Sequence, residues 1–143
     1  MLLIHNPLPD ASPRPGAEQI HLRVERRMFL KRRWRGVAGD GTEFGFDLAG
    51  RLHSGAVIHR TESKDYVILQ ELEPVYEIAV ASASGAALVG WKIGNLHFPV
   101  EIGDAWVRVT HDPAVGQLCA REGWPVTEKT VVFNPLRVAA HAS

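Results

Sequence analysis

The feature that most limits the fold of this 143-residue chain is a change of hydrophobic pattern near Glu73-Pro74. Before that point, short alternating apolar runs are separated by turn signals such as Asp40-Gly41, a pattern typical of strands. After it, segments with helical spacing alternate with segments that have strand spacing. The sequence therefore predicts an α+β protein, with a small all-β module over residues 1–74 and a mixed module over residues 75–143.

The first module is predicted to contain strands and turns without a helix. A short apolar run at its start indicates an edge strand, and the prolines that follow indicate an extended loop. The predicted strands cover Leu2–Ile4, His21–Leu30, Arg33–Ala38, Glu43–Leu48, Val57–Ile58 and Tyr66–Leu72.

The second module is predicted to follow the order β-α-β-β-α-β, which is the ferredoxin-like order. Ser82 or Ser84 can cap its first helix, and Gly94 is expected to end that helix in the left-handed conformation. Asp112 can cap the second helix, which Gly123 ends. The apolar stripes expected to face the core are Ala83, Ala86, Ala87, Gly90 and Trp91 in the first helix and Val115, Leu118 and Cys119 in the second. The strands are expected at Val75–Ala79, Phe98–Ile102, Ala105–Thr110 and Val126–Phe133.

Charge and composition exclude several classes of protein. The 16 basic and 16 acidic side chains give a formal net charge of zero, whereas generic nucleic-acid binding needs a basic excess. No apolar run approaches the ~20 residues that span a bilayer, and the first residues lack the basic region of a signal peptide. A single cysteine cannot form an internal disulfide, which suits the reducing cytoplasm. Together with the balanced charge and the short apolar runs, this predicts a cytoplasmic protein that binds neither nucleic acid nor membrane.

The sequence predicts no catalytic activity. Cys119 lies on the expected apolar stripe of a helix, where a core position is the usual role. The chain contains no nucleophile elbow, no phosphate-cradling glycine loop and no HExxH motif. His5, His21, His53 and His59 show no metal-ligand spacing.

His97 is the first candidate for a metal ligand, because it lies between a predicted helix end and a predicted strand. A metal site needs several protein ligands, and a twofold homodimer would supply two copies of one histidine. Imidazole binds nickel, copper and zinc, so the ligand does not identify the metal. From spacing alone, a packed or capping histidine is the favoured interpretation.

Two further histidines are candidates for weaker metal ligation. His111 precedes the predicted N-cap Asp112 and the helix-starting Pro113, so a surface ligand and a plain exposed residue beside a cap are both compatible with the pattern. His141 lies near the C-terminus, where it either completes a coordination sphere or is incidental, and the sequence does not favour either interpretation.

The segment Arg23–Arg35 carries seven basic residues and two aromatic ones. A solvated strand face is the usual role of such a run. A surface for an acidic protein partner is the next interpretation, and a site for single-stranded nucleic acid is a third.

Several segments resemble the UreE family of urease accessory metallochaperones. The most specific is WKIGNLHFPVEI (Trp91–Ile102), which is similar to the family pattern Y-H-L-G-N-R-H-x-P-x-x-I. The other matching segments are RRWRGVAGDGTEFGFDL (Arg32–Leu48), LHSG (Leu52–Gly55) and VRVTHDPAVGQLCAREGWPV (Val107–Val126). The likeness covers most of residues 20–135.

The resemblance implies a cytoplasmic homodimer that carries Ni(II) to the urease apoprotein, alongside the accessory GTPase that handles nickel. It places His97 on the family's main metal histidine and His111 on the first histidine of a peripheral site. It places His141 in the tail, where relatives often carry histidines. Zinc and copper are alternative ions.

Four residues depart from the family pattern. Lys92 and Leu96 replace a histidine and an arginine near the main site, and Pro113 replaces the second peripheral histidine. Ala56 replaces an aspartate in the β module. Because the tail holds only His141, we expect a low capacity of about one ion per dimer.

Two functions from different classes follow from the sequence. The first is a nickel metallochaperone, in which few imidazole ligands at an open interface give moderate affinity and fast release. The second is a metal-free interaction module that holds a protein partner with the basic face Arg23–Arg35. The first function requires His97, whereas the second does not depend on it.

Overall fold

The computed structural model describes residues 1–9 and 11–136, and the chain divides into two compact units, Met1–Glu71 and Leu72–Ser143. Residues 72–74, which the hydrophobic pattern assigns to the first module, belong to the second unit. The reason is that the strand expected from Val75 already starts at Glu73. Pro74 is tolerated in this strand because only one neighbouring strand pairs at its position.

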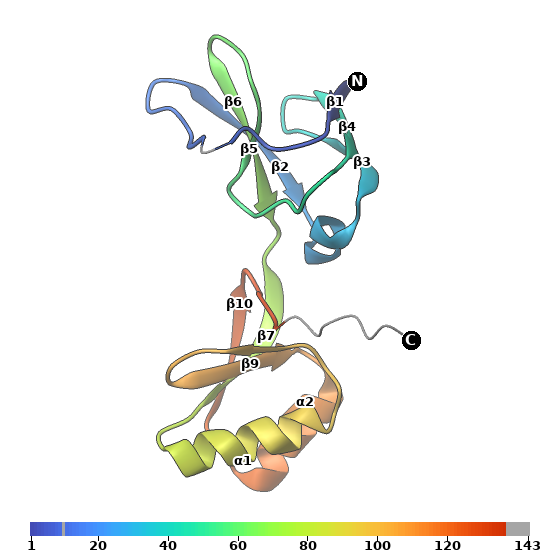
Figure 1. Cartoon of the computed structure of the whole chain (residues 1–143). Coiled ribbons are helices and arrows are strands. Elements are labelled where there is room, and N and C mark those ends of the chain that lie inside the picture. Colours follow the sequence, from blue (N-terminus) through green and yellow to red (C-terminus); the bar gives the residue numbers. More distant parts are fainter. Residues whose placement is uncertain (10, 137–143) are drawn as a thin grey trace. The chain divides into compact units, whose positions relative to one another are not determined.

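The described part of the first unit contains two three-stranded sheets with the orders β1-β4-β3 and β2-β6-β5 (Figure 1). Each sheet holds one parallel pair, β1 with β4 and β2 with β6. The elements are β1 (Leu2–Ile4), β2 (Glu18–Val24), the 3-10 helix η1 (Arg26–Leu30), β3 (Arg33–Val37), β4 (Glu43–Asp47), β5 (Val57–Arg60) and β6 (Lys64–Gln70).

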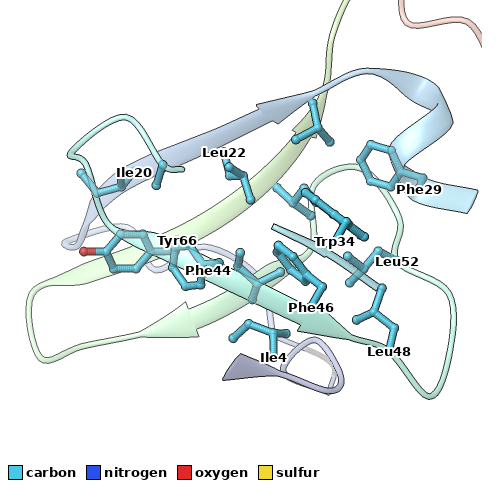
Figure 2. Packing of buried hydrophobic residues seen from close by; sticks show 14 residues of the cluster. Ile4, Ile20, Leu22, Phe29, Trp34, Phe44, Phe46, Leu48, Leu52 and Tyr66 are labelled. Carbon is cyan, nitrogen blue, oxygen red and sulfur yellow. The ribbon is translucent and has the colours of Figure 1, made fainter. Parts of the chain in front are cut away.

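The core of the first unit is built from the apolar faces of these strands and of η1 (Figure 2). Trp34 and Phe46 are cross-strand partners on β3 and β4, and their rings stack with centroids 4.1 Å apart. Such an aromatic pair contributes about 0.5–1.5 kcal/mol beyond the burial of its surface. Ile4 reaches the same core from β1, which confirms the predicted edge strand.

The strand predicted over His21–Leu30 is wrong in its second half. The strand β2 ends at Val24, and η1 follows from Arg26. A continued strand would have alternated Arg26 and Met28 inward and left Phe29 outside. The 3-10 turn instead buries Phe29 in the core, so the gain from burying an aromatic side chain decides the local conformation.

The second unit has the predicted order β-α-β-β-α-β, with both helices on one face of an antiparallel sheet (Figure 1). The sheet order is β10-β7-β9-β8, so the first and third strands of the module lie at the centre. The α+β fold predicted from the sequence is therefore confirmed. The elements are β7 (Glu73–Ala79), α1 (Ala83–Gly94), β8 (Val100–Ile102), β9 (Trp106–Thr110), α2 (Pro113–Glu122) and β10 (Val126–Val131).

Helix α2 has the predicted boundaries and the predicted buried face. The Asp112 side chain accepts a hydrogen bond from the N–H of Ala114 at 2.9 Å, and Pro113 occupies the first turn. Gly123 ends the helix with a φ of 70°, a left-handed value that favours glycine. The buried residues are Val115, Leu118 and Cys119.

Candidate metal centre

The backbone at the end of α1 positions His97. Ser82 caps the start of the helix by accepting a hydrogen bond from the N–H of Gly85 at 3.0 Å. The helix ends at Gly94, but this residue does not turn left-handed as predicted. His97 does so instead, with a φ of 61°, and its N–H donates to the carbonyl of Gly94 at 3.2 Å. A non-glycine residue in this region is uncommon, and such residues cluster at functional sites.

The left-handed turn directs the side chain of His97 into solvent. Its neighbours Leu96 and Phe98 are half-buried and pack against the core of the second unit, so the backbone on both sides is held. The imidazole itself is exposed, and no partner within the described residues hydrogen-bonds to it. Both ring nitrogens are therefore available to a ligand.

The exposed face of α1 beside His97 is apolar. The predicted stripe is wrong, because the residues that face the core are Val89 and Ile93, while Ala83, Ala87, Gly90 and Trp91 are exposed. Trp91 is 66% exposed and Leu88 is 44% exposed. These two side chains lie three residues apart and therefore share one face of the helix.

His111 lies directly after β9 and belongs to no metal-holding group of three or more His, Cys, Asp or Glu side chains within the described residues. Its Nε2 atom lies 2.7 Å from Oε1 of Glu128 on β10, and its ring stacks on Tyr76 with centroids 4.4 Å apart. The sequence pattern did not predict Glu128 as a partner of His111. The available signal was its place on the strand expected at 126–133, but pairing with His111 required the sheet order.

The side chain of Lys92 is engaged in an ion pair between the two helices of the second unit. Its Nζ atom forms a salt bridge with Glu122, which joins α1 to α2. Leu96 packs against the core. The two departures from the family pattern near His97 therefore have structural roles.

The described chain ends close to the His97 segment. The N–H of Leu136 donates to the carbonyl of Val100 at 2.7 Å, and the N–H of Asn134 donates to Oε1 of Glu101 at 3.2 Å. His141, the third candidate ligand, lies outside the described residues.

Cys119 is buried in the core of the second unit. Burial raises the pKa of the Cys119 thiol above its ordinary value, so the reactive anion is disfavoured at neutral pH. Within the described residues, no group of three or more His, Cys, Asp or Glu side chains could hold a metal ion. His97 therefore does not belong to a preformed group of three such ligands within the described residues.

The fold and these features define a small two-unit protein whose C-terminal ferredoxin-like unit presents a histidine. Residues 73–143 match the family described as "UreE urease accessory protein, C-terminal domain". The chain is 26% identical over 136 residues to the urease accessory protein UreE of Beijerinckia indica subsp. indica, covering 94% of this chain and 79% of that protein. It is 25% identical over 139 residues to UreE of Pseudomonas fluorescens, covering 94% of this chain and 81% of that protein.

A third relative, UreE of Bifidobacterium longum subsp. infantis, is 33% identical over 82 residues, which cover 57% of this chain and 37% of that protein. Through its C-terminal half, the chain belongs to the UreE family of urease accessory proteins. It is an accessory protein and not an enzyme. No helix among the described residues is long and apolar enough to cross a membrane.

Proposed function

We propose that this chain is a metallochaperone that binds Ni(II) as a homodimer and delivers the ion for assembly of the urease active site. The observation that carries the proposal is the side chain of His97. It is an exposed imidazole without a partner in the described chain, and it is held in a left-handed turn in a UreE-family domain. Neutral imidazole is a good nickel ligand.

The apolar face of α1 supports a twofold dimer. In an isologous interface the same patch faces itself, so Leu88 and Trp91 of one subunit would cover the same residues of the other. The two His97 side chains, just beyond the ends of the two helices, would then supply two imidazoles to one ion. We expect about one ion per dimer at this position.

The position of Leu136 supports a role for His141. This histidine follows Leu136 by five residues, and an extended chain spans at most about 3.5 Å per residue, or roughly 17 Å. Since Leu136 is bonded to Val100, three residues after His97, the tail of either subunit has the length to bring His141 to the same ion. His141 is therefore the proposed additional ligand.

His111 is the proposed position for a second, weaker ion. If its Nε2–H donates to Glu128, the Nδ1 atom is left as the metal ligand, an arrangement in which a carboxylate orients the imidazole. With Pro113 in place of a neighbouring histidine, water must complete the sphere. The affinity is accordingly low.

The proposed clients are the urease apoprotein and its accessory GTPase in the cytoplasm. In this division of labour the ferredoxin-like unit binds the ion and the β unit holds a partner. Zinc and copper compete with nickel for imidazole ligands, and copper binds such sites more tightly, so the ion carried depends on availability.

Calorimetric titration of the full-length apo-protein with nickel tests the proposal, comparing wild type with His97→Ala at matched concentrations. His53→Ala is the matched control, because it removes another exposed histidine from the first unit. We expect about one tightly bound ion per dimer for wild type and for the control, and loss of this ion in His97→Ala. Activation of apo-urease by the nickel-loaded protein then tests delivery.

Equal nickel binding by wild type and His97→Ala would show that His97 is not the ligand. Absence of nickel binding by the wild type would remove the metallochaperone function. Nickel binding without any activation of apo-urease would leave a metal-binding protein that serves a different client.

A further inference from the structure

The last described residues cross the sheet of the second unit from one edge to the other. The strand β10, which ends at Val131, lies at one edge of the order β10-β7-β9-β8. Five residues later, the N–H of Leu136 donates to the carbonyl of Val100 on β8, the opposite edge, at 2.7 Å. Between these points the side chain of Phe133 is completely buried, so packing as well as hydrogen bonding holds this segment. We call residues 132–136 the strap.

A row of charged side chains on the face of the sheet opposite the helices contacts the middle of the strap. The residues before and after Arg108 on β9 are buried in the core with the helices, so Arg108 points to the other face. Glu101 on β8 and Glu77 on β7 are the cross-strand partners of Arg108 and share this face. The N–H of Asn134 in the strap donates to Oε1 of Glu101 at 3.2 Å.

The side chain of Glu101 is held in place by the other members of this row. Its Oε1 atom lies 3.7 Å from Nη1 of Arg108, and the Nε atom of Arg108 donates to Glu77 at 2.9 Å. The guanidinium of Arg108 also lies over the ring of Trp106, 4.1 Å from the ring centroid. The side chains of Glu101 and Arg108 are each 18% exposed, so their contact is largely shielded from water. A carboxylate held in this way presents a fixed, charged acceptor to the backbone of the strap.

We infer that Glu101 is a positioning residue for the proposed nickel site: it does not bind the ion, but holds the strap so that the tail after Leu136 starts beside the strand that follows His97. The inference rests on the proposed function, in which His141 in the tail supplies a further ligand. Val100, to which the strap is bonded, follows His97 by only three residues. The tail therefore begins close to the ion that it is proposed to reach.

The strap also shortens the free part of the tail. Without it, the last anchor before His141 would be the buried Phe133, eight residues away, whereas Leu136 is five residues away. The effective concentration of a tethered ligand falls roughly as the −3/2 power of the tether length, so the shorter tether raises it about twofold. The fixed starting point beside β8 adds a preferred direction to this gain.

Direct coordination of the ion by Glu101 is a poorer role for this side chain. Its Oε1 atom is already engaged by the N–H of Asn134, and the guanidinium of Arg108 lies beside it. A divalent cation at the same carboxylate would be repelled by this guanidinium. The contacts of Glu101 therefore favour holding the strap over binding the ion.

The nickel affinity of the full-length protein, measured by competition with a chromophoric chelator, tests the inference. Glu101→Ala removes the acceptor, whereas Glu101→Gln keeps a side-chain oxygen for the N–H of Asn134. Each change is also made together with His141→Ala, so that a double-mutant cycle measures the coupling between the two positions. Asp104→Ala is the matched control, because it removes an exposed carboxylate three residues away that has no partner among the described residues.

We expect Glu101→Ala to weaken nickel binding about threefold, slightly more than the tether length alone gives, and to have no effect when His141 is already alanine. Glu101→Gln and Asp104→Ala should bind nickel as wild type does. Because ligand binding and anchoring are linked reciprocally, nickel should also slow hydrogen exchange in the peptide that contains the strap. This protection should be absent in Glu101→Ala and in His141→Ala. Circular dichroism establishes that each variant is folded.

Three results would overturn the inference. Nickel affinity is unchanged in Glu101→Ala, or it falls equally with and without His141, which would make Glu101 a ligand or a purely structural residue. Alternatively, His141→Ala binds nickel as tightly as wild type, so the tail supplies no ligand to position. Failure of the proposed function gives a different result: the wild type binds no nickel, or His97→Ala binds it equally, which removes the site and the inference with it.

Discussion

The Nε2 atom of His111 lies 2.7 Å from Oε1 of Glu128, so a residue that follows β9 is joined to an edge strand that is not its neighbour. The strand β7 lies between them in the sheet, and the ring of its Tyr76 stacks on the imidazole. His111 is therefore held on two sides, and its orientation is set by the sheet order.

The contact between His111 and Glu128 leads to a prediction about the second, weaker nickel ion proposed at His111. Glu128→Gln should lower the affinity of the second nickel ion about tenfold, because the amide orients the imidazole less strongly than the carboxylate. The first ion should bind as in wild type. Calorimetry with excess nickel measures both, with Glu43→Gln as the control that removes an exposed glutamate from the first unit. A second ion that binds His111→Ala unchanged would show that His111 is not its ligand.

If the exposed apolar face of α1 forms the dimer interface, polar substitutions on it should weaken the dimer. Leu88→Ser with Trp91→Ser should weaken self-association at least tenfold, because burial of each of these side chains contributes about 1.5–3 kcal/mol. Analytical ultracentrifugation measures the dissociation constant. Val37→Ser also removes an exposed apolar side chain, but from the first unit, and should leave the dimer intact. A dimer unaffected by the α1 changes would place the interface elsewhere.

The left-handed backbone at His97 should make the stability of the protein depend on the residue at this position. His97→Gly should be about 1 kcal/mol more stable than His97→Ala, because glycine adopts a φ of 61° without a steric cost and alanine does not. Both variants lack the imidazole, so both should lose the first nickel ion. Urea denaturation measures the difference. Equal stability of the two variants would indicate that the turn relaxes when the histidine is removed.

The buried carboxylate of Asp65 should make the folding stability of the first unit depend on pH. Burial alone would raise the pKa of Asp65, but hydrogen bonds from the Arg14 backbone N–H and from the Arg60 and Arg14 side chains outweigh it and lower the pKa to about 2. Because the folded-state pKa is below the unfolded value of about 3.9, this contribution to stability is complete above pH 4 and is lost as the pH falls toward 2.

Asp65→Asn should therefore lower the urea midpoint at pH 7, and about half of the pH-dependent part of the difference should be gone by pH 3. Circular dichroism follows the unfolding. Asp47→Asn is the control, because it removes an exposed carboxylate whose pairing with Arg33 stabilises by at most about 1 kcal/mol. A difference between wild type and Asp65→Asn that stays constant from pH 7 to pH 3 would contradict the assignment.

In the turn between β8 and β9, the indole of Trp106 packs closely against Gly103. A Cβ atom added at Gly103 would lie 2.3 Å from Cε2 of Trp106, so Gly103→Ala must displace the indole. We expect a loss of about 1–3 kcal/mol of stability, the usual cost of overpacking. Gly50→Ala is the control, because a Cβ atom there meets nothing within 4 Å. Equal stability of both variants would show that the indole moves aside freely.

Local signals were sufficient for much of the fold. The capping pair Asp112-Pro113 and the left-handed Gly123 define α2 in the sequence as they do in the structure. These features depend on backbone groups within a few residues, which a local pattern contains. The β-α-β-β-α-β order follows from the same kind of information.

Longer-range competition decided the elements that were predicted wrongly. Helix α1 offered two apolar faces, and the core took Val89 and Ile93 while leaving Trp91 outside. The segment after Val24 could have continued as a strand, but burial of Phe29 favoured a 3-10 turn. In both places the local sequence contains several apolar residues, but it does not determine which of their side chains the other elements of the unit bury.

The sequence by itself determined the element order, the helix caps and the UreE resemblance on which His97 became the main candidate, because these are properties of short segments. Only the tertiary structure decided that His97 is left-handed and exposed beside an apolar helix face. It also decided that His111 pairs with Glu128 and that residue 136 lies against Val100. Those relationships join residues from different elements, and packing of the sheet fixes them.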